Sequence, residues 1–196
     1  MKNLKTNTMT QTAILAAVVL IMAFTPLGYL KTPGLEITFI TIPVIIGAVI
    51  IGPKAGAVLG CLFGLTSFLQ CFGLSTFGAA LLAINPFYTF IVCVIPRTLM
   101  GFLCGVVFKF LSRKSDSALV YGVSSLCGAL LNTLFFMSFL IFFFGSSDYI
   151  KGFMGDMSVL RFVVAFVGAQ GAIEAAVCFV IAAAISKTLA RFMHKQ

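Results

Sequence analysis

The chain has 196 residues, of which 61% are hydrophobic and 9% are charged, and 13 Lys or Arg against 5 Asp or Glu give it a net charge of +8. A soluble domain carries about 25% charged residues, so this composition excludes a soluble globular enzyme, a disordered chain and a secreted disulfide scaffold. The sequence therefore predicts an integral membrane protein.

Uncharged runs mark the expected membrane spans, because crossing the hydrocarbon core takes about 20 mainly apolar residues. Residues 55–96 form 42 consecutive positions without a charge, enough for two passes with a break at 70–78. The sequence predicts an all-α bundle of six transmembrane helices in one domain covering 1–196. The expected helices lie approximately at 12–31, 35–52, 54–72, 84–112, 117–146 and 159–188.

Lysine and arginine predict the orientation, because the cytoplasmic loops of membrane proteins are enriched in both residues. With the N-terminus inside, nine basic residues lie on the cytoplasmic side: Lys2, Lys5, Lys54, Lys109, Arg113, Lys114, Lys187, Arg191 and Lys195. Three lie outside: Lys31, Lys151 and Arg161. The sequence therefore predicts that both termini are cytoplasmic, in a multi-pass protein of the plasma membrane.

Small residues recur at helical spacing on three of the expected spans. Glycines repeat every four residues in the third span and twice in the fourth: Gly52, Gly56, Gly60, Gly64, Gly101 and Gly105. Such stripes let two helices approach closely inside a membrane. The first span carries the pair Ala13 and Ala17, which could pack within the bundle or contact another membrane subunit.

Arg97 and Glu174 are ionisable residues well inside the expected spans, where a charge needs a partner or a function. Counted at about 1.5 Å per residue, Arg97, Glu174 and Asn132 all lie about 20 Å below the outer ends of their helices. This common level predicts a buried polar cluster between the fourth, fifth and sixth helices. Further polar residues are expected to line the same cavity: Gln170, Asn85 and Tyr88.

Two interpretations of this cluster remain open. In the first it lines a cavity that binds a ligand, with Asn132 and Gln170 among the ligand contacts. In the second, Arg97 and Glu174 form a buried ion pair that only holds two helices in register. The phenylalanines of the fifth span are expected to face lipid or fill the core, with one or two near the mouth of the pocket able to pack against a ligand: Phe135, Phe136 and 142–144.

Motifs for catalysis, metal binding and nucleic-acid binding are missing from the sequence. Its cysteines form no CxxC pair, and the single histidine, His194, lies in the last three residues, so we expect no metal site and no cofactor. There is no GxxxxGK[ST] phosphate loop and no Ser/His/Asp set, so we expect no enzyme activity. The basic residues form no stripe with stacking aromatics, so we expect no nucleic acid partner.

Several segments, taken in order, resemble a known family. They are the pair Ala13/Ala17, TPGLEITFITIPVIIGAVIIGPKAGAVLGCLFGLTSF (32–68), NPFYTFIVCVIPRTLMG (85–101) and LLNTLFF (130–136). With the order of six short helices, they resemble the substrate-binding S components of energy-coupling-factor (ECF) vitamin transporters over nearly the whole chain. The Pro-Val-Ile-Ile-Gly, Gly-Pro-Lys-x-Gly and Leu-Asn-Thr stretches look most similar to the pantothenate-type members.

The resemblance implies a bacterial subunit that captures a vitamin from outside the cell. Because the pantothenate-type members are the most similar, the vitamin that it implies is pantothenate. It implies a transmembrane coupling subunit and two cytoplasmic ATPase subunits as partners, with Ala13 and Ala17 as the docking face for the coupling subunit. It places the substrate near the outer side, between the outer loops and the fourth to sixth helices. Two alternatives remain: a riboflavin-binding member of the family, and a membrane scaffold subunit without a ligand.

Overall fold

The computed structural model describes residues 2–25, 28–31, 36–113, 117–155 and 157–193. It is almost wholly helical, which confirms the predicted all-α class. In chain order the elements are α1 (Lys2–Ala23), β1 (Tyr29–Lys31), β2 (Glu36–Thr38), α2 (Thr41–Ile50), α3 (Pro53–Gln70), α4 (Thr76–Ile84), α5 (Pro86–Leu111), α6 (Ala118–Phe144), α7 (Asp148–Met154), α8 (Val159–Val177), the π-helical turn η1 (Cys178–Ala182) and α9 (Ala183–Met193).

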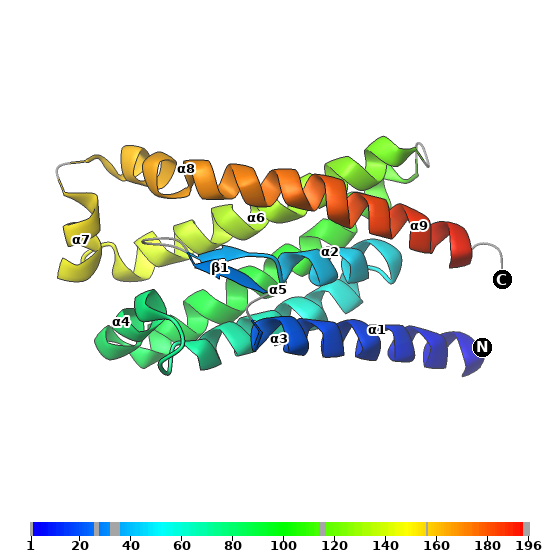
Figure 1. Ribbon diagram of the computed structural model, residues 1–196, viewed down its shortest axis with the longest axis horizontal. Helices are drawn as coiled ribbons and strands as arrows, with labels where there is room; N and C mark the ends of the chain where they lie inside the picture. Colours follow the sequence, from blue (N-terminus) through cyan, green and yellow to red (C-terminus); the bar gives the residue numbers. More distant parts are fainter. Residues whose placement is uncertain (1, 26–27, 32–35, 114–116, 156, 194–196) are drawn as a thin grey trace.

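The long helices run along one axis, with both chain ends at one end of the molecule and α4 and α7 at the other (Figure 1). α8, η1 and α9 continue one another as a single rod that packs along α6. Within the described residues, three helical stretches are long and apolar enough to cross a membrane: Pro86–Leu111, Ala118–Phe144 and Gly171–Leu189. Two shorter apolar helices, Asn7–Ala23 and Thr41–Ile50, accompany them.

The expected helices at 12–31 and 35–52 are wrong at the ends that face each other along the chain, and the first helix also begins ten residues earlier than expected. α1 ends at Ala23 and α2 begins only at Thr41. Thr25 precedes a proline, a position at which the helical conformation is disfavoured. With 10 residues, α2 is about 15 Å long. That length is half of the hydrocarbon core, which is about 30 Å thick.

An antiparallel hairpin of β1 and β2 occupies the space that a longer α2 would have filled, midway along the bundle (Figure 1). Its register pairs Tyr29 with Thr38, Leu30 with Ile37 and Lys31 with Glu36. The backbone N–H of Phe39 also donates to the carbonyl of Gly28 at 2.9 Å. Because non-helical backbone at membrane depth must be satisfied within the protein, this pairing allows the hairpin to enter the bundle and contact α8.

Glycine explains the close contact of α3 with α5, the most extensive helix pair of the fold. A Cβ added at Gly56 would collide with the carbonyl of Gly101, and one at Gly60 would collide with the carbonyl of Arg97. The predicted stripe therefore works as an intramolecular contact. Gly52 is an exception, because it caps α3 with a φ of 124° and has nothing within 4 Å of a Cβ.

The ends of the other helices lie close to the expected positions. α3, α5 and α6 begin and end within two residues of the ranges 54–72, 84–112 and 117–146. α8 begins at residue 159, as expected, but its rod continues to Met193. Two expected loops contain short helices, α4 and α7. These helices are in contact through Phe77 and Tyr149, whose ring centroids lie 6.0 Å apart.

Candidate functional site

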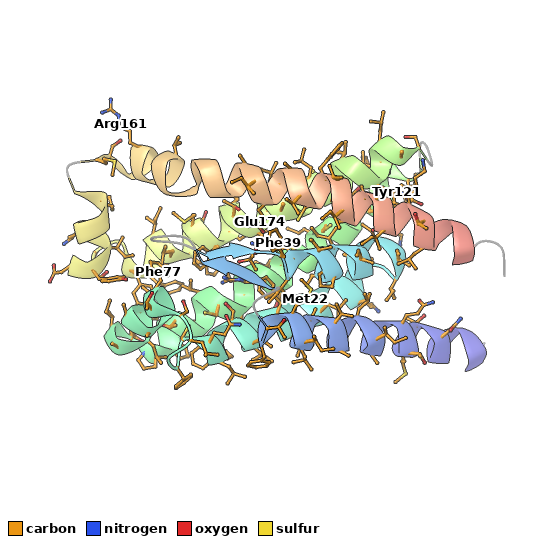
Figure 2. All side chains as sticks on the ribbon, in the orientation of Figure 1. Met22, Phe39, Phe77, Tyr121, Arg161 and Glu174 are labelled. Carbon is orange, nitrogen blue, oxygen red and sulfur yellow. The ribbon has the colours of Figure 1, made fainter. Side chains whose placement is uncertain are left out.

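Asn132 on α6 and Glu174 on α8 form a hydrogen-bonded pair in the interior. Their exposed fractions are 7% and 8%, and Asn132 Nδ2 donates to Glu174 Oε1 at 3.3 Å. Figure 2 places Glu174 roughly midway along the bundle. The amide oxygen, Asn132 Oδ1, is buried and has no hydrogen-bond partner among the described residues. The predicted common depth of these two residues is therefore observed, and one acceptor is left unused.

Arg97 on α5 is also buried, with 8% of its surface exposed. Its Nη1 donates to two carbonyls of its own helix, those of Val92 at 2.7 Å and Cys93 at 3.3 Å. The guanidinium carbon lies 4.5 Å from the ring centroid of Phe136 on α6 and 5.5 Å from that of Phe63 on α3. A cation over two aromatic faces is stabilised by their quadrupoles.

An ion pair between Arg97 and Glu174, one of the two interpretations left open by the sequence, is absent from the part of the chain that the structure describes. Arg97 instead points back along α5, because side chains on a helix lean toward its N-terminus and the carbonyl of Val92 accepts from it there. Arg97 Nε is buried and has no partner among the described residues. The cluster thus holds a guanidinium group and a carboxyl group that are not directly paired with each other.

The start of α2 supplies a further contact to this region. The Thr41 hydroxyl donates to the carbonyl of Thr38 at 3.0 Å and lies 3.5 Å from the sulfur of Cys178. Cys178 follows Glu174 by one helical turn and opens the π-helical turn η1. A helix N-terminus carries a partial positive charge, so the start of α2 brings a compensating field close to the Glu174 side of the cluster.

Other predicted site residues lie apart from this cluster. Asn85 caps α5, and its Oδ1 accepts from the N–H groups of Phe87 and Tyr88 at 3.0 and 3.1 Å. Asn85 precedes Arg97 by twelve residues, about 18 Å along the helix. Tyr88 is 38% exposed and stacks on Phe143, with ring centroids 4.9 Å apart. The side chain of Gln170, the remaining predicted contact, lies outside the described residues.

Sequence reasoning missed the aromatic surroundings of Arg97 and the approach of Thr41. Phe136 was expected to be lipid-facing or core bulk, but its position four residues after Asn132 places it on the same helix face. Phe63 and Thr41 come close only through the pairing of α3 with α5 and the entry of the hairpin. These contacts are long-range, and no local pattern in the sequence signals them.

The cluster can recognise a polar ligand with unlike ends. Arg97 Nε is a free donor with a positive charge, whereas Asn132 Oδ1 is a free acceptor beside a carboxyl group. Buried polar atoms without partners are rare in native proteins and call for an explanation, such as a bound water, ion or ligand. The first end suits an anion and the second suits hydroxyl or amide donors.

The predicted docking pair lies on an outward face of α1. Ala13 and Ala17 are both exposed, and so are their neighbours Ile14, at 60%, and Ile21, at 61%. The opposite side of α1 is buried through Val19. In a membrane protein, such an apolar and partly small surface contacts either lipid or another membrane-embedded chain.

Comparison with known proteins adds independent information. A family model described as "ECF transporter, substrate-specific component" matches residues 7–186. The pantothenate transporter PanT of Leuconostoc mesenteroides subsp. mesenteroides is 32% identical over 142 residues, which cover 68% of this chain and 68% of that protein. The pantothenic acid transporter PanT of Lactococcus lactis subsp. cremoris is 31% identical over 121 residues, covering 56% and 59% of the two chains.

Proposed function

This chain belongs to the family of ECF transporter substrate-specific components, and from that premise we propose that it captures pantothenate for import. Two relatives bear the names of pantothenate transporters, and the buried cluster offers groups that suit this vitamin. The family is one of transporter components and not of enzymes. We assign this chain no catalytic step, and the energy for import comes from partner subunits.

The unmet hydrogen-bonding capacity of Arg97 and Asn132 is the observation that carries the proposal. Pantothenate has a carboxylate at one end, a central amide and two hydroxyls at the other end. Its carboxylate would bind to Arg97 Nε, because charge-assisted hydrogen bonds are the stronger ones. Its hydroxyls would bind to Asn132 Oδ1 and the Glu174 carboxyl, which the hydrogen bond from Asn132 Nδ2 orients.

We further propose six membrane crossings with both termini in the cytoplasm. The two chain ends lie at the same end of the bundle (Figure 1), which requires an even number of crossings. The hairpin and α2 together make the second crossing, and the rod from α8 to α9 makes the last. The excess of basic residues on the expected inner loops supports the orientation, in the plasma membrane of a bacterium.

A transmembrane coupling subunit is proposed to dock on α1, with two cytoplasmic ATPase subunits supplying the energy. The exposure of Ala13 and Ala17 among the larger apolar residues Ile14 and Ile21 supports this assignment. Small residues at this spacing allow a second helix to approach the backbone closely. The rest of the exposed apolar surface is assigned to lipid.

Calorimetric titration of the purified protein with a panel of vitamins tests the proposal. We expect saturable binding of pantothenate, and Asn132→Ala should weaken it. Ser138→Ala is the matched control, because Ser138 lies on the same helix, is exposed, and donates its hydroxyl to the carbonyl of Leu134. Binding of riboflavin instead of pantothenate would change the assigned vitamin, and no saturable binding of any vitamin would leave a scaffold subunit.

A further inference from the structure

Pro96 interrupts the backbone hydrogen bonds of α5 at the level of the buried cluster. Proline has no N–H, and its ring pushes away the carbonyl four residues earlier, which in α5 is the carbonyl of Val92. In a helix embedded in a membrane, a carbonyl without a donor is costly. The sequence therefore creates an acceptor at Val92 that the helix backbone cannot satisfy.

Arg97, the next residue, satisfies that acceptor through its side chain. Its Nη1 donates to the Val92 carbonyl at 2.7 Å and to the Cys93 carbonyl at 3.3 Å. The backbone at this point is held in place by α3, because Gly60 lies directly against the carbonyl of Arg97 and leaves no room for a Cβ. The guanidinium is thus tied to a rigid segment of its own helix.

The two aromatic rings complete this arrangement. The Phe136 and Phe63 ring centroids lie 4.5 and 5.5 Å from the guanidinium carbon, and an aromatic face attracts a cation without forming a hydrogen bond to it. Since Nη1 makes both hydrogen bonds recorded for Arg97 among the described residues, the Nε and Nη2 edge is left for a ligand. This edge is one that binds a carboxylate with two parallel hydrogen bonds.

We infer that Pro96 and Phe136 are positioning residues that determine the specificity of this site for a carboxylate. The missing N–H of Pro96 makes the Val92 carbonyl the anchor for Nη1, and the ring of Phe136 confines the guanidinium, so that Nε and Nη2 face the ligand. Neither residue needs to touch the ligand. The inference rests on the proposed function, because it assigns the carboxylate of pantothenate to Arg97.

Two ligands that differ in a single group test this inference. Pantothenate and its alcohol analogue, in which a hydroxymethyl group replaces the carboxylate, are titrated separately into the purified protein by calorimetry. The ratio of the two dissociation constants measures the carboxylate preference. We expect a preference of about 30-fold for the wild-type chain, in line with a charge-assisted contact, and one within about threefold for Arg97→Gln.

Pro96→Ala is the decisive variant, since it restores an N–H donor to the Val92 carbonyl and frees the guanidinium from its anchor. We expect the preference to fall to about fivefold while the melting temperature stays equal or rises, because a proline within a helix is destabilising. A loss of selectivity without a loss of stability has no purely structural explanation. Pro86→Ala is the matched control, because Pro86 occupies the exposed first turn of the same helix and should leave the preference unchanged.

Phe136→Leu and Phe136→Tyr test the aromatic part independently of Pro96. Phe136→Leu should lower the carboxylate preference about as much as Pro96→Ala does. Phe136→Tyr keeps an aromatic face and should therefore keep the wild-type preference. Full preference in both Pro96→Ala and Phe136→Leu would overturn the inference while leaving Arg97 as the carboxylate contact. Full preference in Arg97→Gln would instead overturn the proposed carboxylate site itself.

Discussion

The hydrogen bond between Asn132 and Glu174 makes a quantitative prediction about ligand affinity. Asn132→Ala removes both the donor to Glu174 Oε1 and the free oxygen assigned to a ligand hydroxyl. A hydrogen bond contributes about 0.5–1.5 kcal/mol, or about 1.5–3 kcal/mol when one partner is charged. We expect pantothenate binding to weaken by about 2 kcal/mol, which is about 30-fold in the dissociation constant.

Glu174→Gln keeps the size of the side chain and an acceptor for Asn132 Nδ2 but removes the charge. We expect a loss of about 1 kcal/mol in binding, about fivefold. Because the two side chains are in contact, the double variant should lose about 1 kcal/mol less than the sum of the single variants. The free energy of unfolding should rise in Glu174→Gln, because a buried carboxylate without an ion pair destabilises the fold.

Calorimetry on the four proteins of this double-mutant cycle, with Ser138→Ala as a control, measures the coupling directly. Thermal unfolding of each variant checks that the bundle remains folded. Strictly additive losses would mean that the hydrogen bond does not orient Glu174 for the ligand. Wild-type affinity in both single variants would refute the assignment of this cluster as the binding site.

Three further predictions concern the surface and the core. Ala13→Trp with Ala17→Trp should leave calorimetric binding intact and abolish uptake of labelled pantothenate in cells that express the coupling module; normal uptake would refute the docking role. Gly56→Leu should lower the melting temperature strongly, because its side chain would meet backbone, whereas Gly152→Leu, with open space at its Cβ, should not. The side-chain amide of Gln70 donates to the last carbonyl of α1 at 2.6 Å. Gln70→Leu should therefore destabilise the fold by about 1–2 kcal/mol and speed hydrogen exchange at the end of α1. Unchanged exchange would show that this bond does not hold the helix end.

Hydropathy predicted the long helices well because each is a single, mainly apolar run between charged or turn residues. α5 and α6 are such runs, and their ends follow from local signals such as Asn85-Pro86, where the asparagine caps the helix and the proline occupies its first turn. The segment 24–40 is different. Its apolar residues suit either a helix or a strand, so hydropathy could not reveal a hairpin whose pairing partners lie several residues apart.

Part of the candidate site was also accessible from the sequence. Counting residues from helix ends placed Asn132 and Glu174 at one level, because α6 and α8 are long helices that pack side by side and depth along such helices is proportional to residue number. The same count brought Arg97 to that level but could not give its direction. Its rotamer depends on the acceptor that Pro96 leaves at Val92 and on rings from two other helices.

The sequence alone indicated that this chain is a helical membrane protein, that Arg97, Asn132 and Glu174 lie in its apolar interior, and which family it resembles, because these properties depend on composition and on the order of segments. Only the tertiary structure decided that Glu174 pairs with Asn132 and that Arg97 turns to its own helix. The reason is geometric: a hydrogen bond is lost with a shift of less than 1 Å or a wrong angle. Side chains from several helices meet with that accuracy only after the whole bundle has packed.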